Sequence, residues 1–237
     1  MKRLFLFAAM LFWCAALLVL RIERTGSLMF VFLVWNLFLA VIPLAAALLF
    51  ERLRERGAGT VLQAGLLGAW LLFLPNAPYI VTDLLHLRVR PQVPLWYDLA
   101  LLLSAAGTGL LMGYASVVIV HRIVARQYGA FAGWSVAVMS LVLSSFGMYL
   151  GRFLRWNSWN VVTAPGALLT DVVSRVLNPF DHPKTIAVTA IFSVLLTLGY
   201  VALQWWELAS GTMSPACPNP PIRRWGASMP STSARRS

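Results

Sequence analysis

Six apolar runs, each close to the length of a membrane-spanning helix, dominate this chain. They cover about residues 4–20, 28–50, 61–81, 99–120, 131–150 and 185–206. A helix needs roughly 20 apolar residues to cross the hydrocarbon core of a bilayer. Only 11% of the residues are charged, which excludes a soluble domain of this size. We therefore predict an all-α, polytopic membrane helical bundle with about six transmembrane helices.

The first run has the character of an uncleaved membrane helix. It starts after Lys2-Arg3, as a signal peptide would, but continues into Arg21-Ile22-Glu23-Arg24 without a small-residue cleavage site. We predict a single transmembrane domain over residues 1–210. The Pro- and Ser-rich basic sequence of residues 211–237 predicts a disordered tail.

The positions of Lys and Arg relative to the spans indicate the orientation. With a cytoplasmic N-terminus, eleven of the 19 basic residues face the cytoplasm and eight face the other side. We predict a multi-pass protein of the cytoplasmic membrane with both termini cytoplasmic. Because the basic loops flank apolar runs, the expected partners are the bilayer and its anionic lipid headgroups rather than nucleic acid. Helix packing would also allow homo- or hetero-oligomers.

The loops after the first, third and fifth spans share one side of the membrane in either orientation. This side carries all four aspartates, two of the three histidines and the pair Arg152 and Arg155. The opposite side has a Glu/Arg linker at residues 51–56, which is typical of a solvated helix end. A localised function is therefore expected on the aspartate side.

A polar segment, Leu74–His86, ends the third apolar run. Pro75 and Pro78 lack the N–H group that an α-helix uses, so we predict that the third helix breaks here. If an α-helix resumes beyond the break, its polar side chains share one face. They are Tyr79, Thr82, Asp83, His86 and Arg90.

Asp83 and His86 have two interpretations. As groups three residues apart on one helix, they are candidates for an acid–base pair or for half of a metal site. Alternatively, they form the polar side of an interfacial helix in headgroup water. Further metal ligands would have to come from Asp98, Asp181 or His182, which show no recognisable spacing. We predict no metal and no cofactor.

A second polar motif, Gly151–Asn160, follows the fifth span. Arg152 and Arg155 are spaced so that a helix would present two guanidinium groups to a phosphate or carboxylate. They would neutralise an anionic ligand or pair with Asp83 or Asp98 on the same side of the membrane. The alternative is an interfacial belt in which Trp156 and Trp159 lie at the membrane boundary and the arginines contact lipid. A short interfacial helix is expected at residues 167–177.

Two further features concern helix packing. Asn36 lies within the second span, where its amide needs a partner, and the carbonyl groups freed at Pro75 and the Asn76 side chain are the expected ones. Small residues four apart, Gly109/Gly113 and Gly147/Gly151, predict close helix contacts.

Three motifs carry a resemblance to a known family. They are LPNAPYIVTDLLHL, WYD at residues 96–98 and YLGRFLRWNSW. Over about residues 28–205 the chain resembles the bacterial membrane-protein family called domain of unknown function 1361. The resemblance implies a multi-span helical protein of the bacterial cytoplasmic membrane, and it assigns no substrate and no catalytic residue.

Three functional hypotheses follow. The first is a transporter or binding protein for an anionic solute or a lipid headgroup. The second is a membrane enzyme in which Asp83 and His86 act on a lipid-linked substrate. The third is a structural or assembly subunit without chemistry of its own. The candidate ligand-binding residues are Asn36, Asn76, Tyr79, Asp83, His86, Asp98, Arg152, Arg155 and Asn157.

Overall fold

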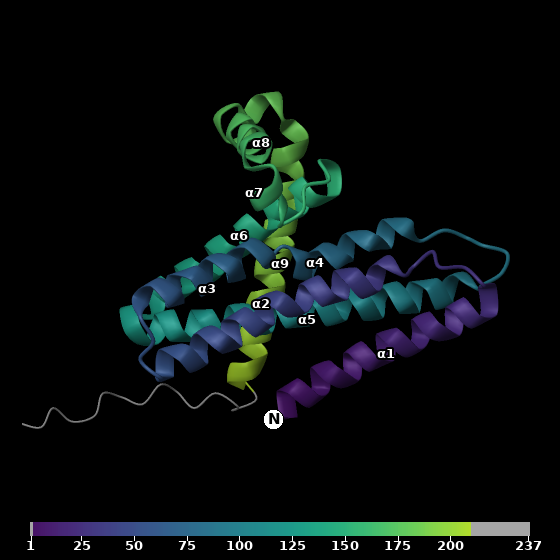
Figure 1. The fold of residues 1–237 in the computed structure, drawn as a ribbon, viewed down its shortest axis with the longest axis horizontal. Helices are drawn as coiled ribbons and strands as arrows, with labels where there is room; N and C mark the ends of the chain where they lie inside the picture. Colours follow the sequence, from purple (N-terminus) through teal and green to yellow (C-terminus); the bar gives the residue numbers. More distant parts are fainter. Residues whose placement is uncertain (1, 210–237) are drawn as a thin grey trace, which may run out of the picture. The chain divides into compact units, whose positions relative to one another are not determined.

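A computed structural model describes residues 2–209 of the chain (Figure 1). Its elements are α1 (Lys2–Thr25), α2 (Phe32–Glu55), α3 (Thr60–Phe73), α4 (Asn76–Tyr79), the 3₁₀ helix η1 (Ile80–His86), α5 (Leu95–Tyr128), α6 (Ala130–Phe153), α7 (Asn160–Thr163), α8 (Pro165–Leu177), the 3₁₀ helix η2 (Pro179–Asp181) and α9 (Pro183–Ala209). The contacts of the chain separate it into two units, Met1–Tyr200 and Val201–Ser237. In the second, residues 201–209 complete α9, and the predicted tail lies outside the described residues.

Within residues 2–209, six segments are long and apolar enough to cross a membrane, as predicted. They are Leu4–Thr25, Phe32–Glu55, Thr60–His86, Leu95–Tyr128, Ala130–Phe153 and Pro183–Trp206. Several extend beyond the apolar runs, because a helix can continue into headgroup and water once its centre is buried in lipid. The 34 residues of α5 would span about 51 Å at ~1.5 Å per residue. The chain is an all-α multi-pass membrane protein.

The centre of the first unit is α5, which packs against α1, α2, α4, η1 and α6. In Figure 1, α2 and α5 lie side by side, in agreement with these contacts. The buried core joins Leu17 and Leu33 to Ile80 and Leu102. These side chains come from α1, α2, η1 and α5, and their burial holds the broken third segment against the bundle.

The third membrane segment is broken at Pro75, as predicted. α3 ends at Phe73, a turn follows at residues 74–75, and one short turn of α-helix leads into η1. The α-helix expected over residues 79–90 is therefore wrong: a 3₁₀ helix ends at His86, and the backbone at Leu87 is extended. In a 3₁₀ helix residues three apart are in line, so Asp83 and His86 share a face with Ile80 rather than with Thr82.

Glycines on two neighbouring helices hold the broken segment closely. A Cβ atom at Gly109 of α5 would lie 2.6 Å from the carbonyl oxygen of Ala77, and one at Gly147 of α6 would lie 2.5 Å from Cγ of Pro75. Neither approach is open to a residue with a side chain. The small-residue spacing in the sequence thus lets α5 and α6 pack against α4 from two sides.

Candidate functional site

Asp83 is the centre of a buried polar network that joins three elements. Its side chain on η1 is almost fully buried. Asn36 of α2 donates from Nδ2 to Oδ2 of Asp83 at 2.8 Å. Nη1 of Arg152, at the end of α6, lies 3.4 Å from Oδ1 of the same carboxylate. An amide and a guanidinium thus satisfy a carboxylate that would be costly to bury alone.

His86 lies at the edge of this network. Its Nδ1 is 3.2 Å from the backbone oxygen of Asp83 and 3.9 Å from Oδ1 of the carboxylate. The ring packs against Phe32, with centroids 5.2 Å apart, and 44% of the side chain is exposed. The imidazole therefore contacts the Asp83 backbone more closely than its carboxylate.

The predicted partner of Asn36 is wrong, because the carbonyl groups at the break are satisfied elsewhere. Asn76 donates from Nδ2 to the carbonyl of Phe73 at 3.0 Å and to Oγ of Ser158 at 2.9 Å. Ser158 in turn donates to the carbonyl of Leu72 at 3.1 Å. The hydroxyl of Ser158 therefore ties the segment after α6 to the end of α3, and Asn36 is left to bind Asp83.

A cavity of about 250 Å³ lies next to the break. Its walls come from α2, α3, α4, α6, the segment after α6, α7 and α8. Polar and aromatic groups on the walls are Trp35, Asn36, Asn76, Tyr79, Trp156, Asn157 and Ser158, and apolar ones include Leu39, Leu71, Leu72, Leu143, Phe146, Leu150, Val161 and Leu168. None of the lining residues carries a charged side chain, and the charged groups Asp83 and Arg152 contact each other rather than the cavity. Volume and lining are those of a small amphipathic binding site.

Trp156, in the segment after α6, anchors α8 beside the cavity. Its indole Nε1 donates to Oδ2 of Asp171 on α8 at 2.7 Å, and Arg175 contacts the same carboxylate at 3.0 Å. The hydrogen bond from Trp156, followed by the contacts with Arg175, lowers the pKa of Asp171. Leu168 of the same helix reaches the cavity wall, so this anchor positions α8 beside the cavity.

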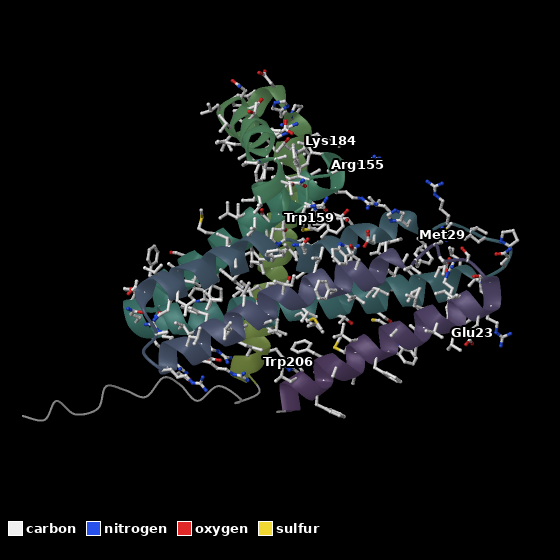
Figure 2. All side chains as sticks on the ribbon, viewed as in Figure 1. Glu23, Met29, Arg155, Trp159, Lys184 and Trp206 are labelled. Atoms are coloured by element: carbon white, nitrogen blue, oxygen red, sulfur yellow. The ribbon has the colours of Figure 1, made fainter. Side chains whose placement is uncertain are left out.

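Arg155 is separated from Arg152. α6 ends at Phe153, and Arg155 has φ +63°, the left-handed conformation that closes many helices. The N–H of Trp156 reaches back to the carbonyl of Leu150 at 3.1 Å. The side chain of Arg155 is exposed, and it is labelled with Trp159 in Figure 2. The helical spacing expected for two adjacent guanidinium groups is therefore broken.

Asp98 belongs to a different network, which sequence reasoning did not foresee. Arg21 of α1 donates from Nε to Oδ1 of Asp98 at 2.7 Å, and Arg90 donates from Nη1 to Oδ2 at 2.8 Å. Both guanidinium groups lie over the ring of Phe30, at 4.4 and 5.2 Å from its centroid. Arg21 and Asp98 both lie at the ends of spans on the aspartate side, and this shared position is the sequence signal that could have suggested the pair.

The nine predicted site residues thus fall into three groups. Asn36, Asp83, His86 and Arg152 form one network, and Asn76, Tyr79 and Asn157 line the cavity beside it together with Asn36. Asp98 and Arg155 belong to neither. Sequence reasoning missed Trp35, Trp156 and Ser158 as wall residues, although the last two lie in the motif that it singled out.

The family comparison agrees with the motifs. The chain belongs to the family described as "Protein of unknown function (DUF1361)", whose model matches residues 35–198. This range contains both the broken helix and the segment after α6. No curated protein and no solved structure matches the chain. The protein is an integral membrane protein of a family without an assigned activity.

Proposed function

We propose that this protein binds one lipid or lipid-like molecule, with its polar group in the cavity beside the broken third segment. The observation that carries the proposal is the mixed wall of the cavity. Apolar side chains and neutral polar groups share it, as an amphipathic ligand requires. The volume of about 250 Å³ is slightly below the ~300–1,000 Å³ of many ligand sites, so a single headgroup is the fitting size.

The surroundings of the cavity favour a ligand that arrives from the bilayer. Trp35, Leu72 and Leu143 line the cavity and are between 37% and 52% exposed. All three lie on segments long and apolar enough to cross a membrane, so we expect this exposed surface to face lipid. Trp35 and Tyr79 also line the cavity, and Trp and Tyr are the residue types enriched where acyl chains meet headgroups. A lipid can therefore place its headgroup inside while its chains stay in the membrane.

The same geometry disfavours anion transport and acid–base catalysis, the two roles that depend on charged side chains. Arg152 is paired with Asp83, and Arg155 is exposed away from the cavity wall, so neither supplies an unpaired cation to an anionic solute. His86 is absent from the residues that line the cavity, and the Asp83 carboxylate is occupied by Asn36. We therefore place lipid binding ahead of anion transport and of acid–base catalysis.

Membrane placement forms part of the proposal. The family resemblance supports the bacterial cytoplasmic membrane, and the excess of basic residues at both ends supports cytoplasmic termini. In this arrangement the cavity opens near the outer leaflet, and the basic loops at the other face contact anionic lipid.

Lipid retention tests the proposal. Wild-type protein is delipidated in detergent and examined by native mass spectrometry, beside Leu143→Trp, which fills the cavity, and Leu103→Trp. Leu103 is 50% exposed on α5 and does not line the cavity, so it is a matched control for Leu143, which is 45% exposed. We expect wild type and Leu103→Trp to keep one lipid that Leu143→Trp loses. Equal retention in all three would contradict the proposal.

A further inference from the structure

The wall of the cavity also indicates which lipid headgroup it accepts, an inference that rests on the proposed lipid site. Asn36 and Asn76 both line the cavity, and each amide has one end fixed by the protein. Nδ2 of Asn36 donates to the carboxylate of Asp83, and Nδ2 of Asn76 donates to the carbonyl of Phe73. Carboxylates and carbonyls only accept hydrogen bonds. The orientation of both amides is therefore set by their partners.

Fixed amide nitrogens leave two carbonyl oxygens for a ligand. Within residues 2–209, no hydrogen bond engages Oδ1 of Asn36 or of Asn76. Both atoms are acceptors, so a group that also only accepts, such as phosphate or carboxylate, would meet like partial charge there. A group that donates O–H or N–H would pair with them and avoid leaving polar atoms unsatisfied.

The other wall residues favour a neutral donor over a cation. Trp35, Tyr79 and Trp156 supply broad ring surface. The Tyr79 hydroxyl and the Asn157 side-chain amide each offer both a donor and an acceptor, which a hydroxyl group can match. An ammonium group would also pair with carbonyl oxygens. However, the Asp83 charge is already neutralised by Arg152, so no unpaired carboxylate is left beside the cavity to balance an ammonium group. An uncharged hydroxyl group meets the acceptors and needs no counter-charge.

We propose that the cavity selects lipids with an uncharged, hydroxyl-bearing headgroup, such as a glycosyl lipid, over lipids whose headgroup is a phosphate or an ammonium. The two Asn Oδ1 atoms accept from the headgroup hydroxyls. The rings of Trp35 and Tyr79 cover its apolar face. The apolar walls contact the part of the lipid nearest the headgroup.

A headgroup series with constant acyl chains tests this selection. The protein is reconstituted in phosphatidylcholine nanodiscs, whose headgroup has no N–H or O–H donor. Monoglucosyldiacylglycerol, phosphatidic acid or phosphatidylethanolamine is then added at equal mole fraction, and the Tm is measured. We expect the glucosyl lipid to raise the Tm by roughly 5 °C at saturation and the other two to have little effect.

Variants separate cavity binding from general lipid effects. The Tm rise should disappear in Leu143→Trp, persist in Leu103→Trp and shrink in Tyr79→Phe, which removes a hydroxyl and keeps the ring. A larger rise with phosphatidic acid or phosphatidylethanolamine would overturn the headgroup inference while lipid binding stood. No rise with the glucosyl lipid, together with cavity-dependent lipid retention, would also overturn it. Absence of both effects would instead contradict the proposed function.

Discussion

Asp83 and Asp98 are equally buried, with 1% of each residue exposed, yet they are held in different ways. Asp98 receives two short guanidinium contacts, from Arg21 and Arg90, and both guanidinium groups lie over the ring of Phe30. Asp83 has one short amide contact and one longer guanidinium contact, at 2.8 and 3.4 Å, beside a cavity. Asp98 joins α1 to α5, whereas Asp83 orients Asn36 on the wall of the cavity where we propose that a lipid binds.

The largest expected effect is therefore at Asp98. Asp98→Asn replaces a carboxylate that neutralises Arg21 and Arg90, and its new amide nitrogen would face their N–H groups. Nη1 of Arg21 is already buried without a hydrogen-bond partner within the described part of the chain. We expect a loss of about 3–5 kcal/mol in the free energy of unfolding, because removing one partner leaves buried charge uncompensated. Titration with SDS in mixed micelles measures it.

Asp83→Asn is the matched substitution and should cost less, about 1 kcal/mol. The new side-chain oxygen can still accept from Asn36, and Arg152, 17% exposed, can turn toward water. The same SDS titration compares the two variants directly. Equal losses in the free energy of unfolding for the two variants would contradict the proposed difference, in which Asp98 holds helices together and Asp83 orients a cavity residue.

Glycine substitutions test whether the cavity wall depends on close packing. Gly109→Ala would place a methyl group against the backbone oxygen of Ala77, and we expect a loss of about 1–3 kcal/mol. Gly107→Ala, on the same helix, meets no atom within 4 Å and should leave stability unchanged or higher. Thermal unfolding in detergent measures both. Tolerance of Ala at both positions would contradict the close approach of α4 to α5.

A smaller, opposite effect is expected at Arg155. An L-residue in the left-handed conformation costs roughly 1 kcal/mol, which glycine avoids. Arg155→Gly should therefore stabilise the protein by up to about 1 kcal/mol and leave lipid retention intact, because the side chain lies outside the cavity wall. Loss of retention in native mass spectra would show instead that Arg155 contributes to binding.

The smallest effect concerns pH and the anchor of α8. Because the pKa of Asp171 is lowered in the folded protein, its carboxylate contributes stability above its ordinary pKa of 3.8, and this is lost as the pH falls through the lowered value. Trp156→Phe should speed hydrogen exchange of α8 at neutral pH and have less effect well below pH 3.8. A pH-independent difference would exclude the Trp156–Asp171 hydrogen bond as the cause.

The same comparison shows which features the sequence could predict. Six spans and the break at Pro75 follow from hydropathy and from the missing proline N–H, both of which are local properties. The partners of Asp83 and Asp98 depend on how helices rotate against one another, and the sequence places seven arginines on that side of the membrane without showing which of them pair with each aspartate. The change to a 3₁₀ helix at Ile80–His86 also altered which side chains share a face.

The cavity was beyond sequence reasoning for a related reason. Its polar wall combines Asn36, Asn76 and Ser158, which are far apart in the chain. Asn76 and Ser158 bind each other and the carbonyl groups of Phe73 and Leu72 that the helix break leaves free, whereas Asn36 is held by Asp83. The periodicity of a sequence identifies which side chains share a face of one helix. It does not predict a cavity that forms between several helices.

The most direct measurement is an experimental map of the protein in phosphatidylcholine nanodiscs that contain monoglucosyldiacylglycerol. We expect headgroup density between Oδ1 of Asn36 and Oδ1 of Asn76, and acyl chains that extend from the cavity alongside Leu143. A cavity closed by side chains, or one that holds a lipid phosphate against these two oxygens, would contradict it.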